Sequence, residues 1–198
     1  MRIFCLYPVK KISYEAPPNG PYIIIANHAS YLDIFFMYSI LPKHPFMFLG
    51  KSEILSYPIV STYFKSMNVP VYRNDKSRAG RAYVGAIQAF KQGYSLSIFP
   101  EGTFPEENLP KMLPFKGGAF KLAKELNAPI LPLTFMNNYA LFSDPMNWLG
   151  PARPGLAVVH IHKLVPVSVV NSMTAEELKA HCFNIISKPL EEKHPELY

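Results

Sequence analysis

Tyr22-Ile23-Ile24-Ile25-Ala26 runs directly into Asn27-His28-Ala29-Ser30-Tyr31-Leu32-Asp33, which is followed by Ile34-Phe35-Phe36-Met37-Tyr38-Ser39-Ile40-Leu41. The first stretch is short, apolar and rich in β-branched residues, and it predicts a buried strand. The last stretch predicts a helix that ends before Pro42. A histidine and an aspartate therefore flank a strand-to-helix turn, where ligands commonly bind in α/β sheets.

The spacing of His28 and Asp33 has two interpretations. In the first, the side chains meet across the turn, the carboxylate fixes the imidazole tautomer, and the other ring nitrogen acts as a base. In the second, Ser30 caps the helix and Asp33 only occupies its first turn, as in a capping box. The residues alone leave both interpretations open.

The composition indicates one globular domain over residues 1–198, which is long enough to bury a sizeable core. Hydrophobic residues make up 49% of the chain and charged residues 17%. No run reaches the roughly 18 uninterrupted apolar residues that a membrane-spanning helix needs. The apolar N-terminal run is broken too early by Pro8 for a signal peptide. Cys5 and Cys182 are expected to be free thiols in a reducing compartment.

The formal net charge of +6 favours an anionic partner. A phosphorylated substrate and an anionic membrane surface both fit this charge. Nucleic acid ranks last, because the chain has no dense Lys/Arg run and no recognisable nucleic-acid-binding module.

Strand patterns and helix patterns alternate along the chain. Strands are predicted at 3–7, 9–14, 46–49, 68–72, 94–99, 129–135 and 156–167, and helices at 53–66, 77–92 and 119–126. A further helix opens at the capping box Thr174-Ala175-Glu176-Glu177 and buries Leu178, Cys182, Ile185 and Ile186. This alternation predicts a single α/β domain with a mixed, mostly parallel sheet flanked by helices.

Helix 77–92 has the clearest amphipathic pattern. Its expected buried face consists of Ala79, Ala82, Tyr83, Ala86, Ile87 and Phe90. Residues 136–155 form an irregular segment with aromatic and aliphatic side chains, and packing on the core is favoured over a membrane-facing role.

Three polar patterns stand out besides His28 and Asp33. Gly50-Lys51-Ser52 is no phosphate loop, because Pro45 stands where that motif needs its first glycine, and Lys51 alone would be a surface lysine. His160 and His162 alternate onto one strand face, but no third metal ligand is evident, so we interpret them as structural. Pro100-Glu101-Gly102-Thr103 places a carboxylate at a second strand end, where it could bind hydroxyl groups.

These blocks together resemble a known family. The motif around His28 and Asp33, the strand ending at Arg73, Phe99-Pro100-Glu101-Gly102-Thr103, and the proline-containing apolar strand at 129–135 occur in that order. In this order and spacing they resemble the lysophosphatidic acid (1-acylglycerol-3-phosphate) acyltransferase family of glycerolipid acyltransferases, over residues 20–167.

The resemblance implies an O-acyltransferase with the family's α/β fold. His28 would be the general base, Asp33 would orient it, and the acceptor hydroxyl would attack the thioester of acyl-CoA or acyl carrier protein. Glu101, Gly102 and Thr103 would bind the acceptor, a lysolipid such as 1-acylglycerol-3-phosphate. Arg73 would bind its anionic head, with Lys51 and Lys116 as further basic residues. Neither a metal nor another cofactor is expected.

The chain departs from the family pattern at two places. Phe104 stands where the family usually has an arginine, so a phosphate-binding cation is missing unless Lys76, Arg78, Lys111 or Lys116 replaces it. Many relatives also carry apolar N-terminal helices. The chain begins almost at its first strand, so it is either truncated, and then soluble, or held peripherally at the cytoplasmic face of a membrane.

Three alternatives follow from these observations. The acceptor could be a lyso-amino-acid lipid, which has no glycerol phosphate. The dyad could activate water and hydrolyse acyl thioesters, although a Gly-x-Ser-x-Gly elbow is absent. A lipid-binding module without activity is disfavoured, because a binder needs no base at His28.

Overall fold

The computed structural model describes residues 8–12, 20–30, 32–42, 44–51, 68–71, 76–105, 108–142 and 153–198. At 32, 51, 68–71, 76, 78 and 79 it describes the backbone alone. The strands are β1 (Val9–Ile12), β2 (Ile23–Ala26), β3 (Phe46–Lys51), β4 (Asn68–Val71), β5 (Ser95–Ile98), β6 (Ile130–Phe135) and β7 (Ala157–Ile161). The helices are α1 (Leu32–Ile40), α3 (Lys76–Lys91), α4 (Gly118–Glu125), α5 (Asn138–Leu141), α6 (Val167–Ser172), α7 (Ala175–Lys193) and the short 3₁₀ helix η2 (Pro195–Leu197).

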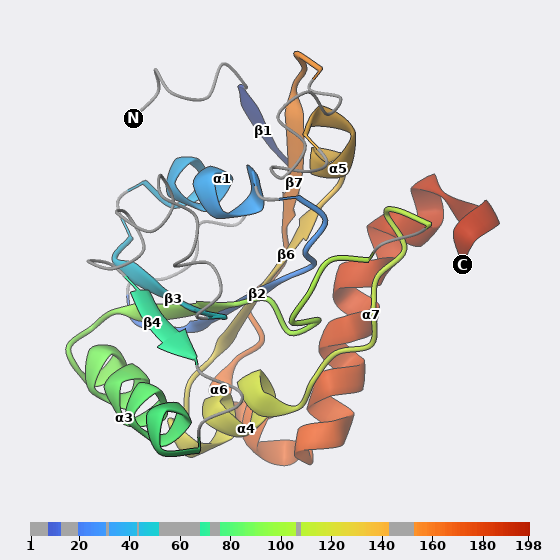
Figure 1. Ribbon diagram of the computed structural model, residues 1–198. Helices are drawn as coiled ribbons and strands as arrows, with labels where there is room; N and C mark the ends of the chain where they lie inside the picture. Colours follow the sequence, from blue (N-terminus) through green and yellow to red (C-terminus); the bar gives the residue numbers. More distant parts are fainter. Residues whose placement is uncertain are drawn as a thin grey trace.

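Within these residues one sheet of seven strands has the order β1-β7-β6-β2-β5-β3-β4 (Figure 1). All neighbouring strands are parallel except β6 and β7, which pair antiparallel. The α/β class and the mixed, mostly parallel sheet predicted by the alternating pattern are therefore confirmed. The central position of β2 explains its continuous apolar sequence, because both of its faces are covered.

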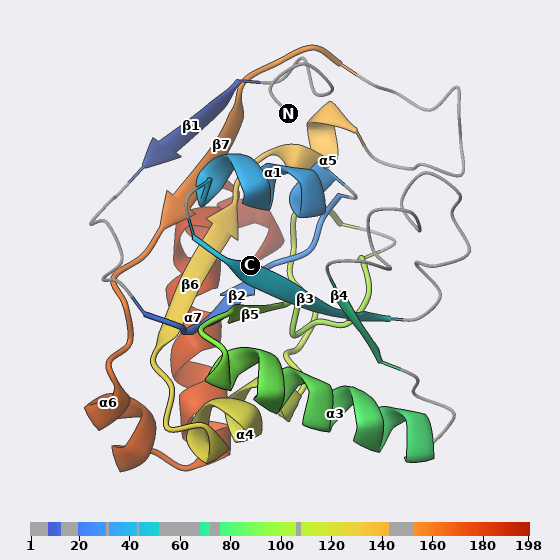
Figure 2. The same ribbon diagram turned by 90° about the vertical axis from the view of Figure 1, so that its left-hand side faces the viewer.

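Alternate residues of β2 point to opposite faces of the sheet. Ile23 and Ile25 belong to a hydrophobic cluster with residues of α3, α4, α6 and α7. Ile24 and Ala26 belong to a second cluster with α1 and Leu141 of α5. Figure 2 accordingly shows α1 and α7 on opposite sides of β6.

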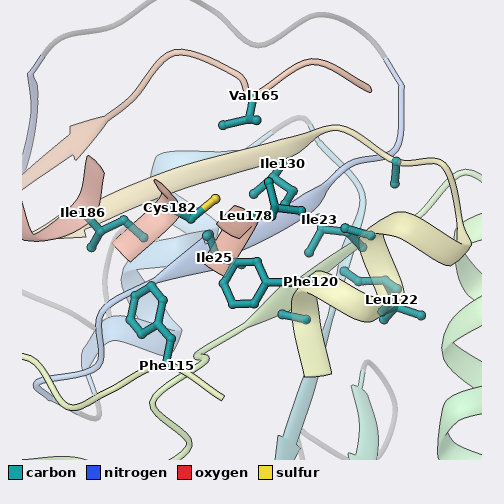
Figure 3. Packing of buried hydrophobic residues seen from close by; sticks show 14 of the residues in the cluster. Ile23, Ile25, Phe115, Phe120, Leu122, Ile130, Val165, Leu178, Cys182 and Ile186 are labelled. Atoms are coloured by element: carbon teal, nitrogen blue, oxygen red, sulfur yellow. The ribbon is translucent and has the colours of Figure 1, made fainter. Parts of the chain in front are cut away.

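The larger cluster joins the sheet to the C-terminal helix. Figure 3 shows Leu178, Cys182 and Ile186 of α7 packing with sheet residues that include Ile25 and Ile130. The predicted capping box begins this helix, since Glu177 N donates to Thr174 Oγ1 at 3.2 Å and Thr174 N donates to Glu177 Oε2 at 2.8 Å. The expected buried face is confirmed at Leu178, Cys182 and Ile186, while Ile185 is partly buried.

The strand predicted at 156–167 is too long. Strand β7 ends at Ile161, Val165 forms only an isolated bridge with Ile130, and α6 begins at Val167. The valines of this segment suggested a strand through their β-propensity. Pro166 precedes α6 in an extended conformation and makes no ladder hydrogen bond, so the segment turns into a helix there.

Two further expectations about side chains are corrected or refined. Tyr83, assigned to the buried face of α3, is 36% exposed, and its hydroxyl donates to Glu125 of α4. In the irregular segment 136–155, Leu141 packs into the core as favoured, and residues 138–141 form a short helix.

Some predictions lie outside the described residues. They include the strand at 3–7, the helix at 53–66 and the apolar residues between 143 and 152. Strand β1 confirms the strand pattern near residue 9, and its partner in the sheet is β7. In the part of the chain that the structure describes, no helix is sufficiently long and apolar to span a bilayer.

Candidate active site

The site lies at the carboxyl ends of three adjacent parallel strands. Strand β2 lies between β5 and β6 and is parallel to both. The segments that follow these strands carry His28, Glu101 and Asn138. This edge of a parallel sheet is where ligands usually bind.

His28 and Asp33 meet in a buried hydrogen bond. The His28 Nδ1 atom lies 2.9 Å from Asp33 Oδ2. The same carboxylate oxygen accepts the backbone N–H groups of Ala29 at 2.8 Å and Ser30 at 2.9 Å. Asp33 is 0% exposed, so its carboxylate is compensated by these donors rather than by water.

The structure shows the contact between His28 and Asp33 together with the carboxylate half of the capping box. Asp33 Oδ2 accepts from Ser30 N, as the acidic residue of a capping box does, and it also accepts from His28. Because an ionised carboxylate only accepts hydrogen bonds, His28 carries a proton on Nδ1. In the neutral ring, Nε2 is then the nitrogen with a lone pair.

Two aromatic rings enclose the imidazole. The Phe99 ring stacks on His28 with centroids 3.9 Å apart and an interplanar angle of 8°. The Phe104 ring lies 4.1 Å from His28 and is tilted by 44°. His28 is only 8% exposed, so these rings help to shield the imidazole from water. Phe104, which stands where the resemblance led us to expect an arginine, therefore contacts the histidine itself.

The segment from the end of β6 through α5 holds the motif from one side. The Asn27 side chain donates to Phe135 O at 3.0 Å and accepts from Phe135 N at 2.7 Å, which continues the β2–β6 pairing by one residue. The Ser30 hydroxyl donates to Phe142 O, and Asn138 Nδ2 donates to Asp33 Oδ1 at 2.6 Å. These partners are more than 100 residues from the motif in sequence, and we did not predict them.

Glu101 holds the motif from the other side. Its Oε1 accepts from His28 N at 2.8 Å, and its Oε2 accepts from Leu113 N at 2.7 Å. The side chain is 2% exposed. Burial raises the pKa of Glu101 to about 7; the backbone N–H groups of Leu113 and His28 oppose this shift, and the charge of Asp33 adds to it. Glu101 thus links two loops, a structural role that the sequence did not reveal.

The structure describes some of the other predicted binding residues but not all of them. Gly102 has a φ of 74°, which favours glycine, and its N–H donates to Phe99 O at 3.0 Å. Thr103 and the Lys116 side chain are exposed, and Lys116 N donates to Pro100 O at 2.8 Å beside Glu101. Arg73 and the Lys51 side chain lie outside the described residues.

His160 lies in β7 and His162 follows its end; the sequence analysis interpreted both as structural. Across the residues that the structure describes, no group of three His, Cys, Asp or Glu side chains could hold a metal ion. The two imidazole centroids are 6.1 Å apart, and His162 Nε2 lies 2.8 Å from Thr134 Oγ1. Thr134 in turn donates to Ile186 O at 2.8 Å, so these contacts link β6 to α7 and to the residue that follows β7.

Comparison with known proteins assigns the chain to a family. The family model described as "Acyltransferase" matches residues 9–136, which include His28, Asp33, Glu101 and Phe104. The chain belongs to the acyltransferase family. The resemblance found in the sequence is thereby confirmed at the level of the family.

Several proteins similar to this acyltransferase-family chain are named as 1-acylglycerophosphate acyltransferases. A 1-acyl-sn-glycerol-3-phosphate acyltransferase of Borreliella burgdorferi is 31% identical over 90% of this chain and 70% of its own length. A protein of the same activity name from Chlamydomonas reinhardtii is 29% identical, and the chain spans only 44% of its length. The crystal structure of the 1-acyl-sn-glycerophosphate acyltransferase PlsC of Thermotoga maritima has a TM-score of 0.75 at 27% identity, covering 94% of this chain and 72% of that one.

The buried Glu101 generates a prediction about stability. Between pH 4.5 and about 7, the Glu101 carboxyl group binds more protons in the folded protein than in the unfolded chain. The free energy of unfolding therefore decreases as the pH rises across this window. Glu101→Gln removes the titration. We expect the free energy of unfolding of the unmodified protein to fall, relative to that of Glu101→Gln, by up to about 3 kcal/mol between these pH values.

Urea unfolding at several pH values from 5 to 8 measures this difference. Glu191→Gln, which alters an exposed carboxylate of α7, is the control for the loss of a charge. A difference between the unmodified protein and Glu101→Gln that stays constant over this range would contradict the raised pKa.

Proposed function

We propose that this protein transfers a fatty acyl group from acyl-CoA or acyl carrier protein to the hydroxyl of 1-acylglycerol-3-phosphate, giving phosphatidic acid. The observation that carries the proposal is the buried His28–Asp33 pair, whose geometry leaves His28 Nε2 as the basic nitrogen. The activity for which the relatives are named supports this acceptor.

The proposed reaction needs one proton relay. His28 Nε2 takes the proton of the acceptor hydroxyl as its oxygen attacks the thioester carbonyl carbon. The tetrahedral intermediate then collapses, the carbon–sulfur bond breaks, and the imidazolium returns the proton to the leaving thiolate. Asp33 accepts the hydrogen bond from the Nδ1–H group throughout, remains ionised and stabilises the imidazolium. The thioester is already activated, so alignment and proton removal suffice without an acyl-enzyme.

Substrate binding is assigned to the segments around this pair. Arg73, Lys51 and Lys116 are proposed to bind the anionic head of the lysolipid. Glu101, Gly102 and Thr103 are proposed to line the acceptor site, Glu101 also positioning the His28 backbone. The acyl thioester is a co-substrate, and the proposal involves neither a metal nor another cofactor. A peripheral location at the cytoplasmic membrane face would give access to the lysolipid, and the net charge of +6 suits an anionic surface.

Phe104 supports a second candidate acceptor. Its ring contacts His28 where the family usually has an arginine, so the immediate surroundings of the base lack that cation. A lyso-amino-acid lipid, whose head group has no glycerol phosphate, would suit this environment. The two acceptors can be compared directly in the same assay.

The primary test measures thiol release from palmitoyl-CoA by the purified protein. We expect release to depend on 1-acylglycerol-3-phosphate and to fall by about 10² to 10⁴ in His28→Ala, because a positioned general base contributes about that factor. The control is His181→Ala, which alters a histidine of α7. Near-normal rates in folded His28→Ala would contradict the mechanism, and acceptor-independent release of fatty acid would identify a hydrolase.

Acceptor selection is tested by Phe104→Arg. An arginine beside His28 can pair with a phosphate, so we expect the ratio of kcat/KM for 1-acylglycerol-3-phosphate over a lyso-amino-acid lipid to rise roughly tenfold. Phe104→Leu keeps the position apolar and controls for loss of the ring. An identical ratio in the arginine and leucine variants would show that residue 104 does not select the acceptor.

A further inference from the structure

The side chain of Asn138, the first residue of α5, makes a hydrogen bond to the His28–Asp33 pair. Its Nδ2 atom donates to Asp33 Oδ1 at 2.6 Å, and the residue is 0% exposed. The other Asp33 oxygen is occupied by His28 Nδ1 and two backbone N–H groups. Asn138 therefore supplies the donor that satisfies Oδ1.

Packing stability alone does not explain an asparagine at this position. Within the described residues, Asn138 Oδ1 has no hydrogen-bond partner, although it is fully buried. Burying an unpaired amide oxygen is unfavourable. The buried Oδ1 atom of Asn138 is therefore unfavourable for stability, whereas its Nδ2 atom makes the hydrogen bond to Asp33.

The orientation of the amide depends on the charge of Asp33. If the amide were reversed, its oxygen would face the carboxylate oxygen at 2.6 Å, and two acceptors would oppose each other. The observed contact consequently favours the ionised form of Asp33. An ionised Asp33 in turn requires His28 to carry its proton on Nδ1.

We propose that Asn138 is a positioning residue of the acyl-transfer reaction, which keeps Asp33 ionised and His28 in the tautomer with a basic Nε2. This inference rests on the proposed function and adds a residue that none of the sequence motifs contains. Asn138 acts through Asp33 and does not touch the reacting atoms.

Asn137 is a matched control from the adjacent position. Its side chain donates to Leu156 O at 2.9 Å and accepts from Val158 N at 2.9 Å, so it fastens the same segment to β7. Asn137→Ala removes two hydrogen bonds without touching Asp33. Asn138→Leu removes only the donor to Asp33 and keeps a side chain of similar size.

The direction in which Asn138→Leu should shift the protonation of His28 follows from the charges around the imidazole. Among the described residues, the titratable groups that meet His28 are Asp33 from α1 and Glu101 from the segment after β5, and both are present in the two variants. The β6–α5 segment contributes the neutral Asn138, and Phe99 and Phe104 carry no charge. Without Asn138 the charge of Asp33 is less compensated and holds the imidazole proton more strongly.

Two measurements test the proposal. In Asn138→Leu we expect the acidic limb of the pH profile of kcat/KM to move up by roughly one pH unit and kcat to fall about tenfold, with little change in KM for palmitoyl-CoA. The titration of the His28 ring carbons, followed by NMR on the substrate-free protein, should move in the same direction. Asn137→Ala should change neither the pH profile of kcat/KM nor the NMR titration of His28.

The NMR titration separates this inference from the function it rests on. If the protein proves inactive with every acceptor, a shifted His28 midpoint in Asn138→Leu still supports the positioning role. An unshifted midpoint, or an equal shift in Asn137→Ala, would overturn it. Circular dichroism checks folding, and Asn138→Ala is measured in the same way should the leucine variant fail to fold.

Discussion

The Asp33 carboxylate is fully buried, and most of the site's geometry follows from that fact. A buried negative charge is tolerated only when donors surround it. Here the donors are two backbone N–H groups of the strand-to-helix turn, the His28 imidazole and the Asn138 amide. Satisfying one charge therefore fixes the turn after β2, the first turn of α1 and the position of α5. It also fixes which nitrogen of His28 carries the proton.

Support for this pair continues outward through the fold. Glu101 links the His28 backbone to Leu113, and the neighbouring Met112 N donates to the hydroxyl of Tyr198 at 3.1 Å. The loop beside the site is thus held by the residue that follows η2. On the other side, Asn27 extends the pairing of β2 with β6. The aromatic rings of Phe99 and Phe104 then restrict access of water to the imidazole, which strengthens electrostatic interactions inside.

Features that depend on residues close together in the sequence could be predicted from local sequence patterns. Strand β2, helix α1 and the cap at Thr174 follow from hydrophobic periodicity and from side chains that bond within three residues. Proximity of His28 and Asp33 was also predictable, because only five residues separate them. The strand predicted at 156–167 overran the end of β7 at Ile161, since Pro166 cannot donate to a strand ladder and α6 begins at Val167.

Long-range contacts could not be predicted in the same way. The bond from Asn138 to Asp33 spans 105 residues and depends on the order of the strands, which hydrophobic periodicity does not specify. Glu101 was recognised as a site residue, but nothing in its neighbours showed that both of its oxygens hold backbone N–H groups. The useful signal was present, however: Asn138 lies three residues after the apolar strand β6, at the carboxyl edge of the sheet.

The ¹⁵N NMR spectrum of the His28 imidazole, assigned by its loss in His28→Ala, tests the central claim most directly. At a pH where the ring is neutral, the bond to Asp33 predicts a protonated Nδ1 and an Nε2 with the chemical shift of an unprotonated nitrogen. Asp33→Asn should abolish this preference, since an amide can donate to Nδ1. A ring protonated on Nε2 in the unmodified protein, or one that exchanges between both tautomers, would contradict the assignment of His28 as the base.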